Sequence, residues 1–445
     1  MLLNRLPNRM TEAFDNFFNY LVTVGPSKLI RVFWFFIFFE FLRFFLFELT
    51  TLVIWAIGKK SRKLRYKVAR QKLFIDRPLV SIIVPGKNEG EHIYNLVMSM
   101  KEQTYTNFEF IVIDDGSDDN TEHICKSLQK NGFIDLFLRN DVRGGKASAA
   151  NLGFRYSRGK IIVHLDADCS YDNDALEKII IPFYLDENIG AVGGNILVRN
   201  YKDSLCATLQ AIEYSDIISV GRITSSYLGI YRVVSGAFGA FKREALERVG
   251  GWDIGPGLDG DITVKLRKLD YRIAFEPEAI CQTSVPNTFK KLVKQRLRWD
   301  KSLIRFRVRK HRDVFYPNST FKFSNLISST ENITYNLILN FKWWIYVLDM
   351  TMNYPTILAF IIPFNILLYT TTNFLKFLTF SLFRTRKNER VTYFLIYLPC
   401  MVFYFGLYLR IVRTIAYIDE IFFKRSYEDP WNPVKSSQHA KELGL

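Results

Sequence analysis

The chain has 445 residues, of which 49% are hydrophobic and 16% aromatic, and its formal net charge is +16. This composition excludes a disordered tail, and it argues against a wholly soluble protein because the apolar residues gather in residues 33–58 and 334–418. The five scattered cysteines form no CxxC pair, so neither a zinc site nor a disulfide framework is indicated.

The first predicted elements are an N-terminal interface segment, residues 1–32, and a transmembrane helix, residues 33–58. This second stretch has 26 residues, and at 1.5 Å per residue it exceeds a hydrocarbon core of roughly 30 Å. Glu40 and Arg43 share one helical face, where they are expected to pair. Eight basic residues and no acidic residue lie from Lys59 to Lys72, which is typical of a cytoplasmic flank. The alternative is a helix lying in the membrane interface.

The central domain is predicted to span residues 72–315. Short β-branched runs alternate in it with helical patterns, which is typical of a mostly parallel sheet covered by helices. The runs lie at residues 80–85, 108–114, 160–166, 190–198 and 233–242. Ligands bind such sheets at the carboxyl ends of the strands. Acidic residues fall there, since Asp114 and Asp115 end one run and Asp166 and Asp168 end another.

Asp166 and Asp168 form an Asp-Ala-Asp triplet that places two carboxylates on one side of an extended chain. Such a pair can hold a hard divalent cation, Mg²⁺ or Mn²⁺, against phosphate oxygens. A triplet of this kind by itself is more often a turn. The second carboxylate pair and a basic glycine loop in the same domain favour the ligand site.

The glycine loop runs from Arg143 to Gly153. Gly144 and Gly145 let its backbone approach a ligand, and Lys146 supplies a cation beside the start of a helix, so the loop is predicted to bind a diphosphate. A GxGxxG string at residues 255–260 follows no apolar strand and contains a proline, which disfavours a Rossmann dehydrogenase.

Residues 316–423 are predicted to form interface and transmembrane helices, about three in number, and residues 424–445 a C-terminal tail. The apolar stretches are residues 336–351, 355–383 and 391–417. The basic segment at residues 384–390 is expected to be cytoplasmic, so a third crossing would leave the tail outside. The alternative is an interface helix at the first stretch, with the second bending back at residues 370–373.

Six motifs occur in order over about residues 75–315: VSIIVPGKNEG, VIDDGSDDNT, RGGKASAAN, HLDADC, GGWD with GLDGD, and QRLRW. As an ordered set they resemble the processive family 2 glycosyltransferases of the cellulose, chitin and hyaluronan synthase type. The flanking membrane segments are similar to that family as well. The resemblance implies an α/β domain of the GT-A type that binds a nucleotide sugar.

The resemblance also implies residue roles. Nucleotide binding falls to Pro85, Glu89, Asp114, Asp115, Lys146 and Asp166, and metal binding to Asp166 and Asp168. Asp259 matches the proposed general base of the TED motif. The acceptor and the diphosphate fall to Gln295, Arg298 and Trp299, the QxxRW residues. The Glu of the TED motif is absent, so Asp261 is a rival base, and no FxVTxK gating loop is evident.

The implied activity is polymerisation of a sugar from a UDP-sugar into a β-linked polysaccharide, with inversion at the anomeric carbon and export through the enzyme's own helices. The implied location is the inner or plasma membrane, crossed several times, with a cytosolic catalytic domain. The implied partners are the donor, the growing polysaccharide and the lipid bilayer, without nucleic acid. The alternatives are a non-processive transferase acting on a lipid phosphate and a catalytically idle nucleotide-binding membrane protein. The sugar, the linkage and the need for an accessory subunit or a homo-oligomer are left open.

Overall fold

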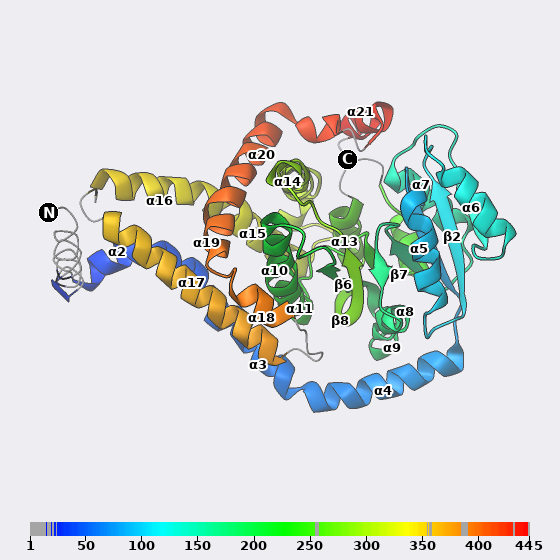
Figure 1. The fold of residues 1–445 in the computed structure, drawn as a ribbon, viewed down its shortest axis with the longest axis horizontal. Coiled ribbons are helices and arrows are strands. Elements are labelled where there is room, and N and C mark those ends of the chain that lie inside the picture. The colour runs from blue at the N-terminus through cyan, green and yellow to red at the C-terminus, as the bar shows by residue number, and fades with distance from the viewer. Residues whose placement is uncertain are drawn as a thin grey trace. The chain divides into compact units, whose positions relative to one another are not determined.

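The computed structural model describes residues 15, 19, 22–23, 25–253, 258–353, 355, 358–383, 390–429 and 432–443. The chain divides into two compact units, each made of two stretches of sequence (Figure 1). The first comprises Met1–Ile54 and Thr334–Ile411, and the second Trp55–Ile333 and Val412–Leu445. Most of the expected interface segment at residues 1–32 lies outside the described residues.

The second unit contains an eight-stranded sheet with the strand order β3-β2-β1-β4-β7-β6-β8-β5. Its strands are β1 (Val80–Gly86), β2 (Phe108–Asp114), β3 (Leu136–Arg139), β4 (Ile161–Leu165), β5 (Ser170–Tyr171), β6 (Ile189–Val198), β7 (Phe238–Lys242) and β8 (Arg272–Thr283). The pairs β1–β2, β2–β3 and β1–β4 are parallel, whereas β7 is antiparallel to both β4 and β6. The expected mostly parallel sheet is therefore a mixed sheet, because the chain re-enters it at β7 in the opposite direction.

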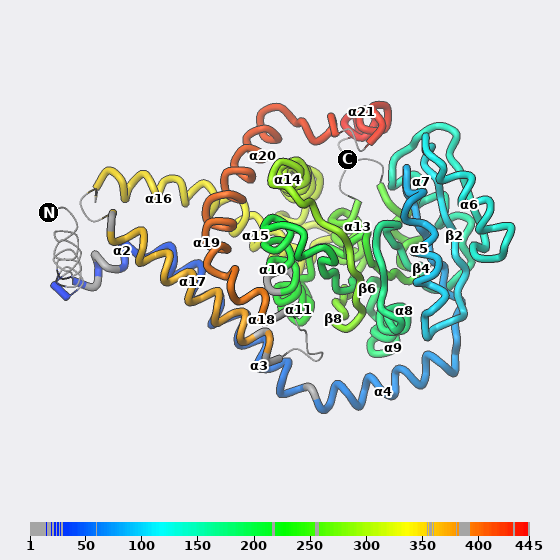
Figure 2. Tube along the Cα trace, in the orientation of Figure 1, coloured from blue at the N-terminus to red at the C-terminus, as the bar shows by residue number. Residues whose placement is uncertain are grey.

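β1, β2 and β4 are buried along almost their whole length, as expected for continuous apolar runs at the centre of a covered sheet. The helix α7 packs on β1 and β2. A Cβ atom at Gly153 in α7 would lie 2.2 Å from Ile83 Cγ2 and 2.5 Å from Ile113 Cδ1, so only glycine permits this approach. The packing sets the start of α7 beside the carboxyl ends of the two strands (Figure 2).

The helices of the second unit cover the sheet and extend from it. They are α4 (Lys59–Asp76), α5 (Gly90–Lys101), α6 (Thr121–Lys130), α7 (Lys146–Tyr156), α8 (Ala175–Ile180), α9 (Pro182–Leu185), α10 (Leu205–Ile212), η3 (Glu213–Ile218), α11 (Ser219–Tyr227), α12 (Arg243–Val249), α13 (Leu258–Lys268), α14 (Phe289–Leu303), η4 (Ile304–Lys310), η5 (Arg312–Phe315), α15 (Phe323–Ile333), η9 (Arg425–Glu428) and α21 (Val434–Glu442).

The first unit is helical. Its helices are α2 (Pro26–Phe36), η1 (Ile37–Phe41), η2 (Phe44–Leu49), η6 (Thr334–Ile338), α16 (Leu339–Asn353), α17 (Leu358–Phe383), α18 (Arg390–Leu395), α19 (Cys400–Phe403) and η8 (Tyr404–Tyr408), while α3 (Thr50–Ile57) and α20 (Leu409–Phe423) continue past its ends. α17 is one uninterrupted helix, so the alternative of a bend at residues 370–373 is wrong.

Charged side chains in the first unit pair differently from the expectation. Lys376 Nζ lies 3.1 Å from Glu40 Oε2, and Arg43 Nε lies 3.6 Å from Glu48 Oε1. The expected pair of Glu40 with Arg43 is replaced because Lys376, far away in the sequence, approaches the same carboxylate.

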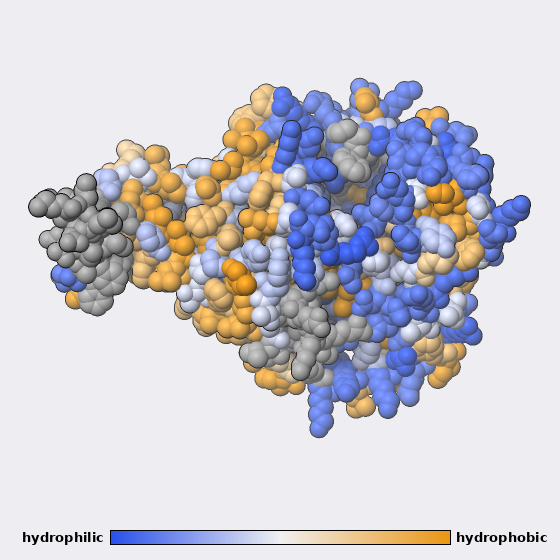
Figure 3. All heavy atoms as spheres, viewed as in Figure 1, coloured by the Kyte–Doolittle hydropathy of each residue, from blue (hydrophilic) through white to orange (hydrophobic). Residues whose placement is uncertain are grey.

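Among the described residues, one helical stretch is long and apolar enough to cross a membrane, the 24 residues Cys400–Phe423. The crossings expected at residues 33–58 and 355–383 stay predictions. The segment at residues 384–389 lies outside the described part of the chain. In Figure 3, hydrophobic side chains cover much of the displayed surface of the helices α16 and α17.

The C-terminal tail belongs to the second unit and contacts its sheet domain. Ser436 Oγ donates a hydrogen bond to the Gly144 carbonyl at 3.0 Å. At the end of α20, Asp419 forms an ion pair with Lys301 and Glu420 forms one with Arg309. The prediction that the tail lies across the membrane from the central domain is therefore wrong. The reason is that two acids within the last turns of α20 bind basic residues of the domain.

Candidate active site

The site lies at the carboxyl ends of β1, β2 and β4. The chain proceeds from β1 through β2 to β3, and then returns to place β4 on the other side of β1. Such a reversal opens a crevice at the strand ends, which is where ligands bind in open α/β sheets. Pro85 lies near the end of β1, and Glu89 directly precedes the helix α5.

The two adjacent carboxylates after β2 have different partners. Asp114 Oδ2 accepts a hydrogen bond from Arg139 Nη1 at 2.9 Å, which anchors the neighbouring strand. Asp115 is buried, and its two oxygens accept hydrogen bonds from the backbone N–H groups of Gly144 and Gly145 at 2.8 and 2.7 Å. Asp115 therefore fixes the glycine loop.

Lys146 begins α7 directly after Gly145, whose φ of +91° favours glycine. Its ammonium forms an ion pair with Asp166 at the end of β4. Burial opposes the charge of Lys146, but Asp166 and Asp259 raise the pKa of this side chain, so it stays protonated. The loop thus carries a fixed positive charge into the crevice.

Asp166 and Asp168 concentrate negative charge beside this lysine, next to the carboxyl of Glu89. Burial, with the charges of Asp168 and Asp166, raises the pKa of Glu89 to about 8. No group of three or more His, Cys, Asp or Glu residues arranged to hold a metal occurs in the described ranges. Asp166 and Asp168 would supply two ligands to a divalent cation. Two carboxylates combined with substrate phosphates are a usual ligand set for Mg²⁺, so these residues fit such an ion.

Asp259 and Asp261, both in the first turn of α13, lie in different environments. Asp259 Oδ2 accepts a hydrogen bond from the Gly236 N–H at 2.8 Å, and burial raises the pKa of its carboxyl. Burial would also raise the pKa of Asp261, but the hydrogen bond with His311 at 2.7 Å and the ion pair with Lys310 at 2.8 Å hold it well below its usual value. Asp261 is thus bound to one cation, Lys310, and to the imidazole of His311.

The QRLRW motif lies on α14, which is capped by the Thr288 side chain. Gln295 Oε1 is buried and accepts no hydrogen bond from the residues that the structure describes. Burial alone would raise the pKa of Asp166, but the positive charges of Lys146 and, to a smaller extent, Arg298 lower it below its usual value. The charge of Arg298 therefore reaches the Asp166 carboxylate.

Trp299 is 36% exposed and is supported by a buried ion pair. The Arg296 guanidinium lies 4.6 Å from the Trp299 ring centroid and forms two hydrogen bonds with Glu213, at 2.9 and 2.7 Å. No local sequence pattern indicates this Arg296–Glu213 pair, because its members are 83 residues apart. Gly236 was predicted to lie inside a strand, although the Ser-Gly pair there is itself a turn signal.

The structure brings Lys146, Asp166 and Asp259 into one cluster of interacting charges. Pro85 and Asp114 lie in the strands and shape the edge of the site. Gly257, the first residue of the TED-like triplet, lies outside the described residues.

The family model described as "Glycosyl transferase family 2" matches residues 81–250. The poly-beta-1,6-N-acetyl-D-glucosamine synthase of Staphylococcus epidermidis is 34% identical over 300 residues, which cover 66% of this chain and 69% of the relative. The synthase of the same name from Staphylococcus aureus strain COL is 35% identical over 256 residues, covering 56% of this chain and 61% of the relative.

Among solved structures, this chain is similar to the mannosyltransferase PcManGT from Pyrobaculum calidifontis, solved in complex with GDP-Man and Mn²⁺. The TM-score is 0.55 and the sequence identity 20%, and the match covers 84% of this chain and 99% of that chain. This likeness concerns the fold, which is of the GT-A type. With the motifs at the strand ends and the Staphylococcus epidermidis relative covered over two thirds of its length, the chain belongs to family 2 of the glycosyltransferases.

Proposed function

We propose that this glycosyltransferase polymerises N-acetylglucosamine from UDP-N-acetylglucosamine into a β-1,6-linked polysaccharide. The synthases at 34% and 35% identity carry that activity in their names. The observation that carries the proposal is the half-buried carboxyl of Asp259, which lies in the same charge cluster as Lys146 and Asp166. Glycosyl transfer needs a general base beside the charges that hold the donor.

Asp259 is the proposed base. Its carboxylate takes the proton of an acceptor hydroxyl, and the hydroxyl oxygen bonds to the anomeric carbon of the donor while the bond from that carbon to the diphosphate breaks. Attack opposite the leaving group inverts the configuration, and UDP departs. The raised pKa of Asp259 supports this role, because a stronger base accepts the proton more readily. Asp261 is the weaker candidate, since His311 and Lys310 both bind its Oδ1 and lower its pKa.

The leaving diphosphate requires positive charge. Lys146 at the start of α7 and Arg298 on α14 supply it from two sides of the cluster around Asp166. Asp115 holds the Gly144–Gly145 backbone in place, so the loop is preorganised for the donor. A divalent cation bound by Asp166 and Asp168 would neutralise charge that develops on the diphosphate.

Trp299 is the proposed platform for the acceptor sugar, whose apolar face stacks on an aromatic ring. The Arg296–Glu213 pair holds this ring from behind, which supports a lasting contact between additions and hence processive synthesis. The apolar stretch Cys400–Phe423 supports attachment to the membrane. A multi-pass arrangement with export of the polymer and a cytosolic catalytic domain is part of the proposal.

The test uses the purified full-length protein with separate UDP-sugars and with GDP-mannose, each with Mg²⁺ or Mn²⁺. We expect polymer only from UDP-N-acetylglucosamine, digestible by a hydrolase specific for β-1,6-linked N-acetylglucosamine. Asp259→Asn is the matched inactive control. Turnover with GDP-mannose alone, or transfer of one sugar to a lipid phosphate without growth of a chain, would overturn the proposal.

A further inference from the structure

A cationic pocket lies in the second unit, away from the donor cluster. It has a volume of about 360 Å³, within the range of small-molecule sites, roughly 300–1,000 Å³. Its lining residues come from η4 and η5, from the start of η9 and from α21, and they are Arg309, Lys310, Arg312, Lys424, Tyr427 and Lys441. Five of the six carry a positive charge, and no carboxylate is among them.

The positive charge of the pocket is only partly neutralised. Lys310 Nζ lies 2.7 Å from Asp253 Oδ2 and 2.8 Å from Asp261 Oδ1, and Arg309 forms an ion pair with Glu420. The remaining cations, Arg312, Lys424 and Lys441, form no ion pair with any residue in the described part of the chain.

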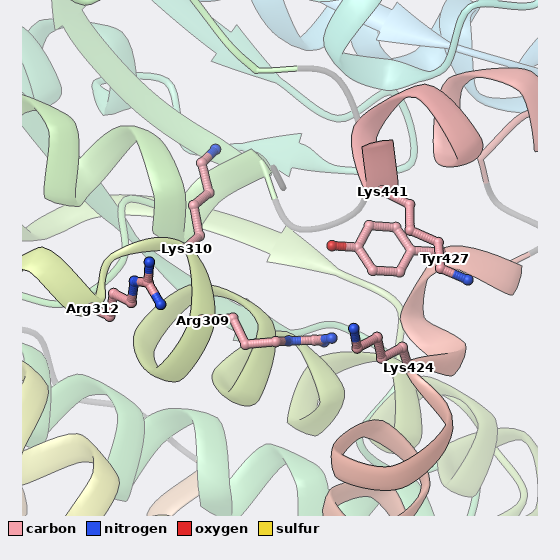
Figure 4. A pocket seen from close by; sticks show the side chains of 6 residues that line it. All are labelled: Arg309, Lys310, Arg312, Lys424, Tyr427 and Lys441. Atoms are coloured by element: carbon pink, nitrogen blue, oxygen red, sulfur yellow. The ribbon is translucent and has the colours of Figure 1, made fainter. Parts of the chain in front are cut away.

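The side chains converge although they repel one another. Figure 4 shows Arg309 and Lys424 extending toward each other from separate elements. The Tyr427 hydroxyl points toward the side of the pocket that carries Lys310 and Arg312. Like charges in a hollow raise the local potential and attract anions, above all anions with several charges. The phosphate group is such a ligand, because it accepts several charge-assisted hydrogen bonds at once.

We propose that this pocket binds an anion bearing more than one phosphate charge, either a soluble one such as a pyrophosphate-containing molecule or the headgroup of an anionic phospholipid. None of the donor residues lines the pocket, so the site is separate from the one that holds the sugar nucleotide. Lys424 follows the exposed apolar residues Phe422 and Phe423 at the end of α20, which is where a lipid headgroup would lie.

The pocket joins the C-terminal tail to the catalytic elements. Lys310 reaches Asp261 in α13, two residues after Asp259. Lys441 belongs to α21, and Ser436 of the same helix donates its hydrogen bond to the Gly144 carbonyl. A Cβ atom at Gly145 would lie 3.2 Å from Asn432 Oδ1, so the tail also closely covers the next residue of the donor loop. An anion in the pocket therefore ties the tail to the domain and steadies the donor loop.

The test measures pyrophosphate binding to the full-length protein by titration calorimetry in detergent without divalent ions. The pocket variant combines Lys424→Gln with Lys441→Gln, and Lys435→Gln on the exposed side of α21 is the control for charge. Lys146→Gln reports on the donor loop. We expect the pocket variant to bind at least tenfold more weakly, about the loss of one charge-assisted hydrogen bond. Lys435→Gln should bind pyrophosphate like the wild type, whereas Lys146→Gln should lose only the binding that occurs at the donor loop.

The lipid source is tested by thermal unfolding of the same proteins in vesicles of phosphatidylcholine alone or with cardiolipin, whose headgroup carries two phosphates. Stabilisation by cardiolipin that the pocket variant loses and Lys435→Gln keeps would support a headgroup as the ligand. Without any anion, the pocket variant should unfold no earlier than the wild type, because repelling charges have been removed. The proposal is overturned if neither anion distinguishes the pocket variant from Lys435→Gln, or if only Lys146→Gln loses pyrophosphate binding.

Discussion

The two acids in the first turn of α13 should respond oppositely to the same substitution. Asp259→Asn keeps the size of the side chain and an oxygen that can accept the hydrogen bond from Gly236. It removes the proposed base, so we expect turnover to fall by about 10²- to 10⁴-fold, or roughly 3–5 kcal/mol on the barrier. Donor binding should change little, because Lys146 and Asp166 remain.

Asp261→Asn should instead reduce stability. The wild-type carboxylate is 4% exposed, forms a hydrogen bond with His311 and pairs with Lys310, which keeps Asp253 as its second partner. Breaking a buried pair costs at most about 3–5 kcal/mol, and the remaining Asp253 partner of Lys310 reduces this loss. We expect an earlier thermal unfolding transition, with turnover per folded molecule closer to that of the wild type than in Asp259→Asn.

The pH dependence follows from the two pKa shifts. The folded pKa of Asp261 is lowered, so its contribution to stability is present above the unfolded value of about 3.9 and is lost as the pH falls through the folded value. The folded pKa of Asp259 is raised, so its ionisation opposes folding, and Asp259→Asn should be at least as stable as the wild type at neutral pH.

The assay combines initial rates of polymer formation, donor binding by calorimetry and thermal unfolding for both variants. In the wild type, kcat/KM should rise with pH through a pKa above the ordinary Asp value, since the base must be ionised. The assignment of Asp259 as the base would be refuted if Asp259→Asn kept nearly full turnover while Asp261→Asn folded stably but was inactive. Asp261 would then be the base.

Three further outcomes are expected. Asp168→Asn should abolish turnover without shifting the unfolding transition, and excess chelator should do the same to the wild type; full turnover in chelator would contradict the metal requirement. Trp299→Ala should reduce polymer synthesis far more than hydrolysis of the donor by water, whereas equal losses would argue against an acceptor platform. Cysteines placed at Gln438 in α21 and at Lys130 in α6 should behave alike toward an impermeant thiol reagent in intact cells, because the tail contacts the sheet domain. Labelling of the Gln438 position alone would show that the tail and the domain lie on opposite sides of the membrane.

Local patterns in the sequence were sufficient for the parts of the site that follow from strand geometry. The buried runs that became β1, β2 and β4 are short, apolar and β-branched, and parallel strands end at one edge of a sheet. The acids after β2 and β4 and the lysine of the glycine loop therefore had to gather there. The ordered motifs were also enough to indicate the family.

Only the tertiary structure decided how these groups are paired. The direction of β7 depends on how the chain returns to the sheet, and no local pattern encodes it. Asp259 and Asp261 are two residues apart and chemically identical, but their partners, Gly236 and His311, come from distant segments. The same holds for the contact of Ser436 with Gly144, which spans 292 residues. Hydrogen bonds and ion pairs over such separations form because packing brings the segments together, so the properties of these carboxyls and the position of the tail belong to the folded chain.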